Sequence, residues 1–112
     1  MFFKQKNNFE IGSALDRGIK RKAKPNQDSL VILKGRGRKR LPPILVLADG
    51  MGGYAGGADA SQSIVQAFRS LYAKAKKLKD FSAFSSQVIE LALNEMRKQA
   101  AKNPQYESMG ST

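Results

Sequence analysis

Short apolar segments with polar connections dominate the first half of the chain. Residues Phe9 to Ala14 alternate between apolar and polar, which predicts a half-exposed strand. Ser29 to Leu33 predicts a second strand, and Ile44 to Ala48 is apolar at every position, which is typical of a strand buried on both faces. Lys34 to Pro43, between these two segments, is polar and interrupted by glycine, as expected of a connection. Asp16 to Gly18 predicts a turn.

The second half of the chain has the spacing of two amphipathic helices. We expect the first from Ala58 to about Leu78 and the second from about Ser82 to Lys102, with Asp80 in the break that caps the second helix and Asn103-Pro104 ending it. The apolar face of the first comprises Ile64, Val65, Phe68, Leu71, Tyr72 and Ala75. The second has two apolar faces, one of Phe84, Val88, Leu91 and Ala92 and another of Ile89, Leu93 and Met96. These two faces predict contacts with more than one layer.

Two carboxylates flank the pair of apolar segments. The segments have matching lengths, so an antiparallel hairpin is the simplest pairing, and it places Asp28 and Asp49 at the same end. Like charges at close range need a compensating group. A lysine or arginine in a salt-bridged turn would serve, and so would a hard divalent cation of the Mg²⁺ or Mn²⁺ type, which takes carboxylate and carbonyl oxygens. Both interpretations remain open on spacing alone.

A glycine-rich segment follows Asp49. It contains Gly50, Gly52, Gly53, Gly56 and Gly57. Together with Ala55, the first two match the degenerate dinucleotide pattern G-x-G-x-x-A. We expect the other glycines to delay the helix, however, whereas the dinucleotide-binding fold starts its helix at once. A second helix also follows where the dinucleotide-binding fold needs a strand. A flexible connection between strand and helix is a further alternative, and glycines also let the backbone approach an ion or phosphate closely.

Composition excludes several chemistries. The chain has 112 residues, enough for one small domain, and contains neither cysteine nor histidine. Disulfides, thiolate nucleophiles, cysteine-based zinc sites and Ser-His-Asp triads are therefore excluded. Catalysis would depend on carboxylates, backbone groups, lysine or arginine, or a bound metal. The first residues, Met1-Phe2-Phe3, are followed at once by polar residues, so we expect no export or membrane signal and a cytoplasmic location.

Positive charge is concentrated in the first 40 residues. The formal net charge is +11, and residues 1–40 hold 12 basic and 3 acidic side chains. Such charge suits a non-catalytic basic module that binds nucleic acid or a protein partner. It also suits a basic surface around a binding site that attracts phosphorylated substrates. Aromatic residues are not interleaved with the basic clusters, so nucleic acid is the less favoured partner.

Three sequence elements resemble the metal-dependent protein phosphatases (PPM, type 2C), in the bacterial style of the motif. They are Pro25-Asn26-Gln27-Asp28-Ser29, then Leu47-Ala48-Asp49-Gly50-Met51-Gly52-Gly53 with Ala55-Gly56-Gly57 and Ala60-Ser61, and finally Met109-Gly110-Ser111-Thr112. Their order and approximate spacing are those of the family. The resemblance covers about residues 9–112, with residues 1–8 as a lead-in.

The resemblance implies a fold, a reaction and a set of site residues. Family members are α+β proteins, four-layer α-β-β-α sandwiches that hydrolyse phosphoserine and phosphothreonine with two Mg²⁺ or Mn²⁺ ions. It implies that Asp49 bridges both ions and that Gly50 offers its carbonyl to one. It also implies that Asp28, with Gln27, holds metal-bound water. The ions would lower the pKa of a bridging water and balance the charge that develops on phosphate.

The chain departs from the family pattern at three places. Met51 stands where some members carry a histidine that is proposed as general acid. Ala23 stands where the phosphate-binding arginine is usual, so the resemblance implies that Arg21 or Lys22 takes this role. The later aspartate motifs that complete the metal site are missing from these 112 residues.

We therefore expect residues 1–112 to be the N-terminal portion of one phosphatase domain, part of the four-layer sandwich. Its expected partners are phosphorylated proteins, in opposition to a serine/threonine kinase. We also expect the chain to be inactive alone, because the missing motifs carry metal ligands. The alternative is the basic binding module.

Overall fold

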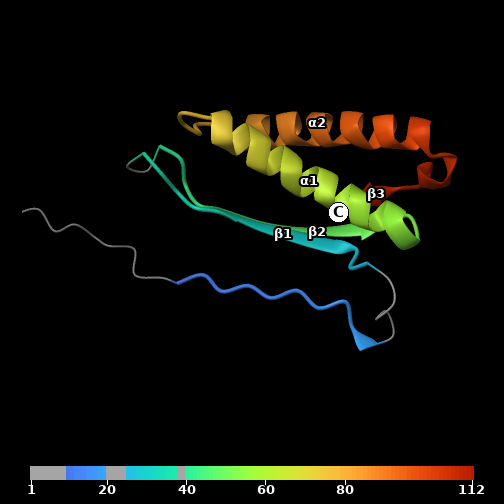
Figure 1. Ribbon diagram of the computed structural model, residues 1–112. Coiled ribbons are helices and arrows are strands. Elements are labelled where there is room, and N and C mark those ends of the chain that lie inside the picture. Colours follow the sequence, from blue (N-terminus) through green and yellow to red (C-terminus); the bar gives the residue numbers. More distant parts are fainter. Residues whose placement is uncertain (1–9, 20–24, 38–39) are drawn as a thin grey trace, which may run out of the picture.

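The computed structural model of the protein describes residues 10–19, 25–37 and 40–112, apart from the side chains of Tyr54 and Ala55. Its elements are β1 (Asp28–Leu33), β2 (Ile44–Met51), α1 (Tyr54–Lys74), α2 (Phe81–Lys102), the 3-10 helix η2 (Pro104–Tyr106) and β3 (Gly110–Ser111). The strands form an antiparallel sheet in the order β1-β2-β3. Both helices lie on one side of the sheet, with α1 between the sheet and α2 (Figure 1). This arrangement confirms the predicted α+β class.

The first two strands form the expected hairpin. β1 begins one residue before the predicted segment, and β2 continues past Ala48 to Met51. Leu33 pairs with Ile44 at the connection, and Asp28 pairs with Asp49 at the other end. The polar connection is closed by an isolated bridge between Arg36 and Leu41. The prediction that both carboxylates lie at one end of a hairpin is confirmed.

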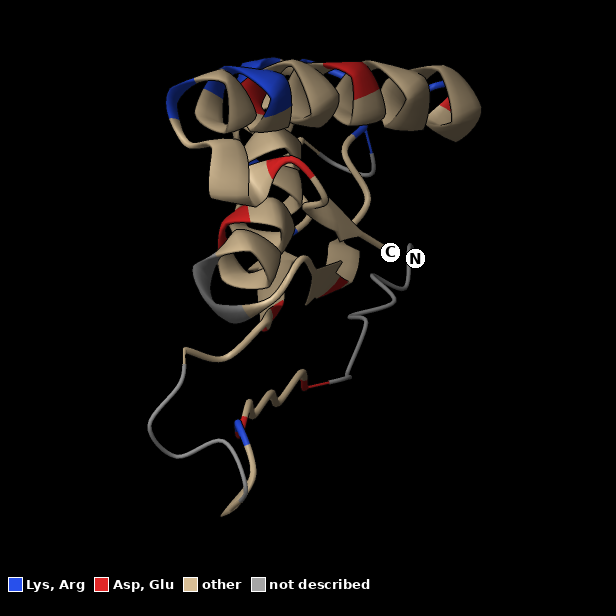
Figure 2. Ribbon diagram, turned by 90° about the vertical axis from the view of Figure 1, so that its right-hand side faces the viewer, with Lys and Arg blue, Asp and Glu red and all other residues tan. Residues whose placement is uncertain are grey.

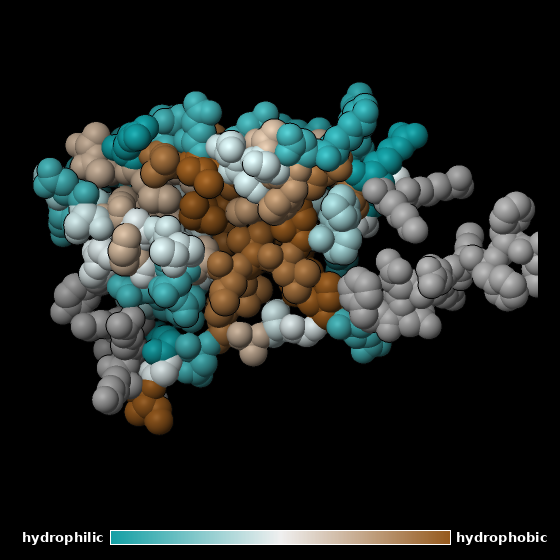
Figure 3. Space-filling view, turned by 180° about the vertical axis from the view of Figure 1, so that it is seen from behind, coloured by the Kyte–Doolittle hydropathy of each residue, from teal (hydrophilic) through white to brown (hydrophobic). Residues whose placement is uncertain are grey.

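Only one face of β2 is buried. Its burial alternates strictly, and Leu45 and Leu47 are 63% and 70% exposed. The prediction that Ile44–Ala48 is buried on both faces is therefore wrong for these residues, because helix α1 packs on one face of the hairpin and no described element packs on the other. Hydrophobic surface gathers in the middle of the molecule when it is viewed from behind (Figure 3).

Helix α1 begins and ends four residues earlier than predicted. Gly52 and Gly53 have positive φ angles of 126° and 66°, and these two residues turn the chain from strand to helix. The expected delay by Gly53, Gly56 and Gly57 is thus wrong, since the last two lie in the first turn of α1. The β1–β2 pair is antiparallel and α1 leads into α2. The described residues therefore do not form the parallel strand-helix-strand unit of dinucleotide-binding proteins.

The C-terminal end of α1 is held by the hairpin connection. The two N–H groups of Arg36 Nη2 donate to three carbonyl oxygens, those of Tyr72, Ala73 and Ala75 at 2.8, 2.8 and 3.0 Å, so one N–H is shared between two acceptors. The Arg36 guanidinium also lies 5.4 Å from the centre of the Tyr72 ring. A cation at this position satisfies terminal carbonyls and complements the helix dipole. The helix consequently ends at Lys74 and does not continue to Leu78.

Helix α2 packs through one stripe. Asp80 caps its N-terminus by accepting a hydrogen bond from the Ala83 amide at 3.1 Å, and Asn103 ends it, both as predicted. Its buried side chains are Phe84, Val88, Ala92 and Met96, which follow one another at four-residue spacing. Leu91, Ile89 and Leu93 are exposed and Met96 is buried, so most of the second apolar face has no partner among the described residues. Among the described elements, α1 is the only helix or strand that packs extensively along α2.

The segment before the hairpin is only partly as predicted. Phe9 lies outside the described residues, and residues 10–14 form no strand, so the predicted strand is wrong there. Residues 10–14 belong to no sheet, since the described sheet consists of β1, β2 and β3, and the segment lies apart from it (Figure 1). The turn at Asp16 to Gly18 is confirmed, because the Gly18 amide donates to Oδ1 of Asp16 at 2.6 Å and Gly18 has a φ angle of 74°.

Two buried hydroxyls join β1 to α1. The hydroxyl oxygens of Ser29 and Ser61 lie 2.8 Å apart, and Ser61 donates to the Ala58 carbonyl at 3.1 Å. Both serines are buried. Since the Ser61 proton goes to Ala58, Ser29 donates to Ser61.

Replacing Ser61 with alanine leaves the Ser29 hydroxyl buried without an acceptor. We expect Ser61→Ala to lower the free energy of unfolding by about 1–3 kcal/mol, and Ser29→Ala combined with Ser61→Ala to cost less than the two single changes together. Urea denaturation of the unaltered protein, the two single variants and the double variant measures these free energies. Ser86→Ala, on the exposed side of α2, is the control. If the double variant loses as much free energy of unfolding as the two single variants together, the hydrogen bond between Ser29 and Ser61 is contradicted.

Candidate metal centre

Asp28 and Asp49 face each other across the hairpin. The Gly50 amide donates to the Gln27 carbonyl at 3.0 Å, so Gln27 and Gly50 are a hydrogen-bonded pair and the neighbouring pair, Asp28 and Asp49, is a non-hydrogen-bonded one. Side chains in such pairs lie closest, with Cα atoms about 4.5 Å apart. Asp28 is half-buried and Asp49 is exposed. The two carboxylates thus approach each other at the surface.

The carboxylates lie on the face of the sheet that α1 does not cover. Residues two apart in a strand share a face, so Asp49 shares the face of Leu47 and Leu45, and Asp28 lies opposite on the same face. Within the described part of the chain, neither carboxylate forms an ion pair. Directly opposed like charges destabilise a sheet unless something compensates them.

A carbonyl oxygen lies beside this pair. The amide and the carbonyl of a strand residue point to the same side, and the Gly50 amide points to β1, so the Gly50 carbonyl also points toward β1. A methyl group placed on Gly57 would lie 3.0 Å from the Gly50 oxygen and 3.0 Å from Nε2 of Gln27. The structure therefore brings Gln27, Asp28, Asp49, Gly50 and Gly57 together.

The glycines allow this close approach. A methyl group on Gly50 would overlap the carbonyl oxygen of Gly57 and lie 2.7 Å from the Gln27 oxygen. Gly52 has positive φ, and a methyl group on it would lie 2.7 Å from Cα of Met109. Gly53 requires its positive φ but has open space around it. Gly56 is buried in the first turn of α1.

Strand β3 holds Asp49 from the other side, which the sequence pattern did not indicate. The Asp49 amide donates to the Thr112 carbonyl at 2.8 Å, and the Thr112 amide donates to the Asp49 carbonyl at 2.9 Å. The Ser111 hydroxyl donates to the same Asp49 carbonyl at 2.9 Å. Residues 106–112 have no periodicity, so the only sequence signal for this strand was the element Met109 to Thr112 itself.

Two of the predicted site residues are not placed. Arg21 and Lys22, expected to bind phosphate, lie outside the described residues. The basic connection of residues 34–43 lies at the opposite end of the hairpin, five residue positions from the carboxylate pair. At about 3.3 Å per residue the separation is about 17 Å. Arg36 of this connection therefore serves helix α1, as described above, rather than the carboxylate pair.

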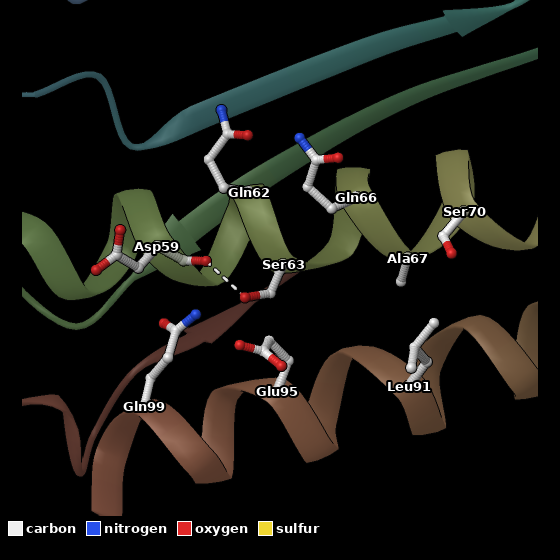
Figure 4. A pocket seen from close by; sticks show the side chains of 9 residues that line it. All are labelled: Asp59, Gln62, Ser63, Gln66, Ala67, Ser70, Leu91, Glu95 and Gln99. Atoms are coloured by element: carbon white, nitrogen blue, oxygen red, sulfur yellow. Dashed lines mark hydrogen bonds between the residues drawn. The ribbon is translucent and has the colours of Figure 1, made fainter. Parts of the chain in front are cut away.

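A concavity lies between α1 and α2. It has a volume of about 370 Å³. Its lining residues are Asp59, Gln62, Ser63, Gln66, Ala67, Ser70, Leu91, Glu95 and Gln99 (Figure 4). The Ser63 hydroxyl donates to the Asp59 carbonyl at 2.8 Å, and the buried amide oxygen of Gln99 has no hydrogen-bond partner among the described residues. This groove is polar at the end that holds Asp59 and Gln99 and contains Ala67 and Leu91 at the other.

The described charges do not form a single basic face. Acidic and basic residues both occur on the helical layer (Figure 2). None of the helices in the part of the chain that the structure describes combines the length and the hydropathy needed to cross a membrane.

Oxygen donors at the end of an antiparallel sheet define the class of site. Two carboxylates and one backbone carbonyl are the donors that hard divalent cations prefer, so the residues present fit Mg²⁺ or Mn²⁺. Three or more acidic side chains are not grouped within the described residues, so these donors supply only part of a six-oxygen shell.

Comparison with protein families matches residues 17–112 to protein phosphatase 2C. The chain therefore belongs to the protein phosphatase 2C family, as its sequence elements predicted. Searches among curated proteins and among solved structures found no match. The family is generally metal-dependent, in keeping with the donor set at Asp28 and Asp49.

Proposed function

We propose that the chain contributes part of the metal centre of a serine/threonine phosphoprotein phosphatase. The supporting observation is the register that places Asp28 directly opposite Asp49, next to the Gly50 carbonyl, in a chain of this family. Asp49 and the Gly50 carbonyl would hold two Mg²⁺ or Mn²⁺ ions, and Asp28 with Gln27 would hold the surrounding water. The remaining oxygen ligands are water or groups outside the described residues.

Each protein group has a separate task in this proposal. The metal ions, when bound, supply Lewis-acid chemistry that acidifies water and balances phosphate charge. Asp49 lies on a strand fixed on both sides, so its carboxylate is oriented before any ligand arrives. Gln27 and Asp28 enter from the neighbouring strand, where a donor or acceptor can orient a water molecule. Arg21 or Lys22 would bind the phosphate of the substrate.

The proposed substrates are phosphoserine and phosphothreonine residues of proteins, in opposition to a serine/threonine kinase. The four-layer sandwich is also part of this proposal: a second sheet would cover the exposed face of β1 and β2 that carries Leu45 and Leu47. Among the alternatives, a nucleic-acid module has less support, because acidic residues are interspersed with the basic ones on the helices.

Removing the Asp49 carboxylate tests the metal centre. We expect the 112-residue chain to bind Mn²⁺, and Asp49→Asn to weaken this binding at least about tenfold, because it removes a charged ligand but keeps the side-chain shape. Titration followed by the electron paramagnetic resonance signal of free Mn²⁺ measures the affinity. Asp80→Asn is the matched control, since it changes the same charge at the cap of α2 and preserves a capping residue.

Equal Mn²⁺ affinity in the two variants would contradict the proposal. We expect the chain alone to hydrolyse no aryl phosphate, because its metal ligands are too few. Mn²⁺-dependent hydrolysis that is lost in Asp49→Asn would overturn this expectation of inactivity while supporting the reaction.

A further inference from the structure

Two connections that are distant in the sequence meet at one end of the molecule. Residues 34–43 join β1 to β2, and residues 75–80 join α1 to α2. The Leu78 amide donates a hydrogen bond to the Arg40 carbonyl at 2.8 Å, so the two connections touch through their backbones. Both lie at the left of Figure 1, opposite the end of the hairpin that carries the carboxylate pair.

This end of the molecule is strongly basic. Besides Arg36, which holds the end of α1, its exposed cations are Lys34, Arg40, Lys74, Lys76, Lys77 and Lys79, and we call these six residues the basic end. Asp80 is the only acidic residue of the two connections, and its carboxylate caps α2 by accepting the Ala83 amide. Within the described part of the chain, none of the six cations is paired with a carboxylate. Positive charge is therefore left uncompensated at this end.

The backbone of the basic end is fixed before any ligand arrives. The Tyr72 hydroxyl donates toward the carbonyl oxygens of Lys34 and Pro42, at 3.0 and 2.9 Å, so its proton is shared between them. Arg36 ties the same connection to the last carbonyls of α1, as described above. An anion that binds here does not have to order two loops, and it also relieves the repulsion between cations held side by side.

The surroundings of the basic end favour an acidic polypeptide segment over duplex nucleic acid. Glu90 and Glu95 are exposed on α2, in the helical layer that adjoins the basic end. A duplex is rigid and carries charge along its whole length, so it would bring phosphates toward these carboxylates once it extends past the basic end. A flexible segment with several carboxylates or phosphates can contact the basic end alone.

We propose that the basic end is a docking surface for acidic or phosphorylated segments of protein substrates. The hairpin places it about 17 Å from the carboxylate pair, so at least about five extended residues separate the docked segment from the phosphorylated residue at the metal centre. Docking raises the local concentration of that residue at the centre. The assignment of the segment to a substrate rests on the proposed function, whereas its binding to the basic end does not.

Neutralising three lysines of the connection between α1 and α2 tests the inference. The probe is a fluorescein-labelled peptide of alternating glutamate and serine, and fluorescence anisotropy in EDTA measures its dissociation constant. We expect Lys76→Gln, Lys77→Gln and Lys79→Gln together to raise this constant at least about fivefold, because exposed ion pairs with the peptide are lost. All three side chains are exposed, so circular dichroism should show an unaltered fold. Lys34→Gln combined with Arg40→Gln should weaken binding as well, because both connections form the surface.

The matched control removes the same charge at the other end of α2, with Arg97→Gln, Lys98→Gln and Lys102→Gln. These residues are also exposed. At about 1.5 Å per residue, α2 separates them from the connection by more than about 20 Å. We expect the dissociation constant of the peptide to change less than about twofold at about 0.1 M salt, where charges more than about 10 Å apart are largely screened.

Every other result overturns the docking surface. Equal losses in the basic-end variant and in its control show a response to net charge alone. Absence of peptide binding by the unaltered chain, or unchanged binding in Lys34→Gln with Arg40→Gln, contradicts a surface built from both connections. The same variants are titrated with duplex DNA and with vesicles of phosphatidylserine and phosphatidylcholine. If either ligand loses a larger factor of affinity than the peptide does in the basic-end variant, the surface belongs to that ligand.

A Mn²⁺ titration of the unaltered chain keeps this inference separate from the proposed function. Mn²⁺ binding without peptide binding overturns the docking surface alone. Peptide binding without Mn²⁺ binding overturns the proposed function, and with it the assignment of the acidic segment to a substrate.

Discussion

Gly50→Ala should lower the free energy of unfolding by at least about 3 kcal/mol, a large fraction of the stability of a domain of this size. The added methyl group would overlap the Gly57 carbonyl and lie 2.6 Å from its carbon, and it would also approach the Gln27 carbonyl. All of these atoms belong to the backbone, so no side-chain rotation relieves the contact. Relief requires α1 to move away from β2.

Chemical denaturation followed by circular dichroism measures this effect. Gly12→Ala is the control, because Gly12 has open space around it and an ordinary backbone conformation. We expect a change within about 0.5 kcal/mol there. A stable Gly50→Ala protein with unaltered α1 packing would show that the contact between Gly50 and Gly57 is looser than described.

Phe84→Ala should be the most costly change in the helical layer, at about 3–5 kcal/mol. Phe84 is 7% exposed, and its ring lies 6.1 Å from that of Phe68 on α1. Truncation removes a large apolar area from the interface between α1 and α2 and leaves a cavity that backbone-fixed neighbours cannot fill.

Phe81→Ala is the matched control on the same helix. Phe81 is 54% exposed and contacts the Phe84 ring at a centroid distance of 6.4 Å, so we expect a loss of about 1 kcal/mol. Urea denaturation of both variants gives the comparison. Similar losses would mean that α2 is not anchored through the buried stripe.

Local patterns predicted the secondary structure and the position of the carboxylates well. The hairpin followed from two matched apolar segments. In a hairpin the residue that enters the first strand and the residue that leaves the second lie at the same end, which places Asp28 opposite Asp49. The cap at Asp80 and the end at Asn103 followed from residue chemistry at helix termini.

The predictions that were wrong depend on contacts between distant residues. Leu45 and Leu47 are apolar, but hydropathy alone does not say which face of a strand has a neighbour. The start of α1 depends on two consecutive glycines with positive φ angles, and its end depends on Arg36, which is 36 positions away from Tyr72. β3 has two residues, too few for any periodicity, and becomes a strand only because Gly50 and Met51 offer it a free edge.

The three hydrogen bonds that Arg36 gives to the end of α1 have a consequence for the way the molecule comes apart. The hairpin contacts α1 closely at Gly50 and Gly57 near one end and is attached to it through Arg36 at the other. A helix attached at both ends cannot swing away as on a hinge. The hairpin and α1 should therefore open as one cooperative unit, whereas α2, which packs on α1 through a single stripe, can separate first.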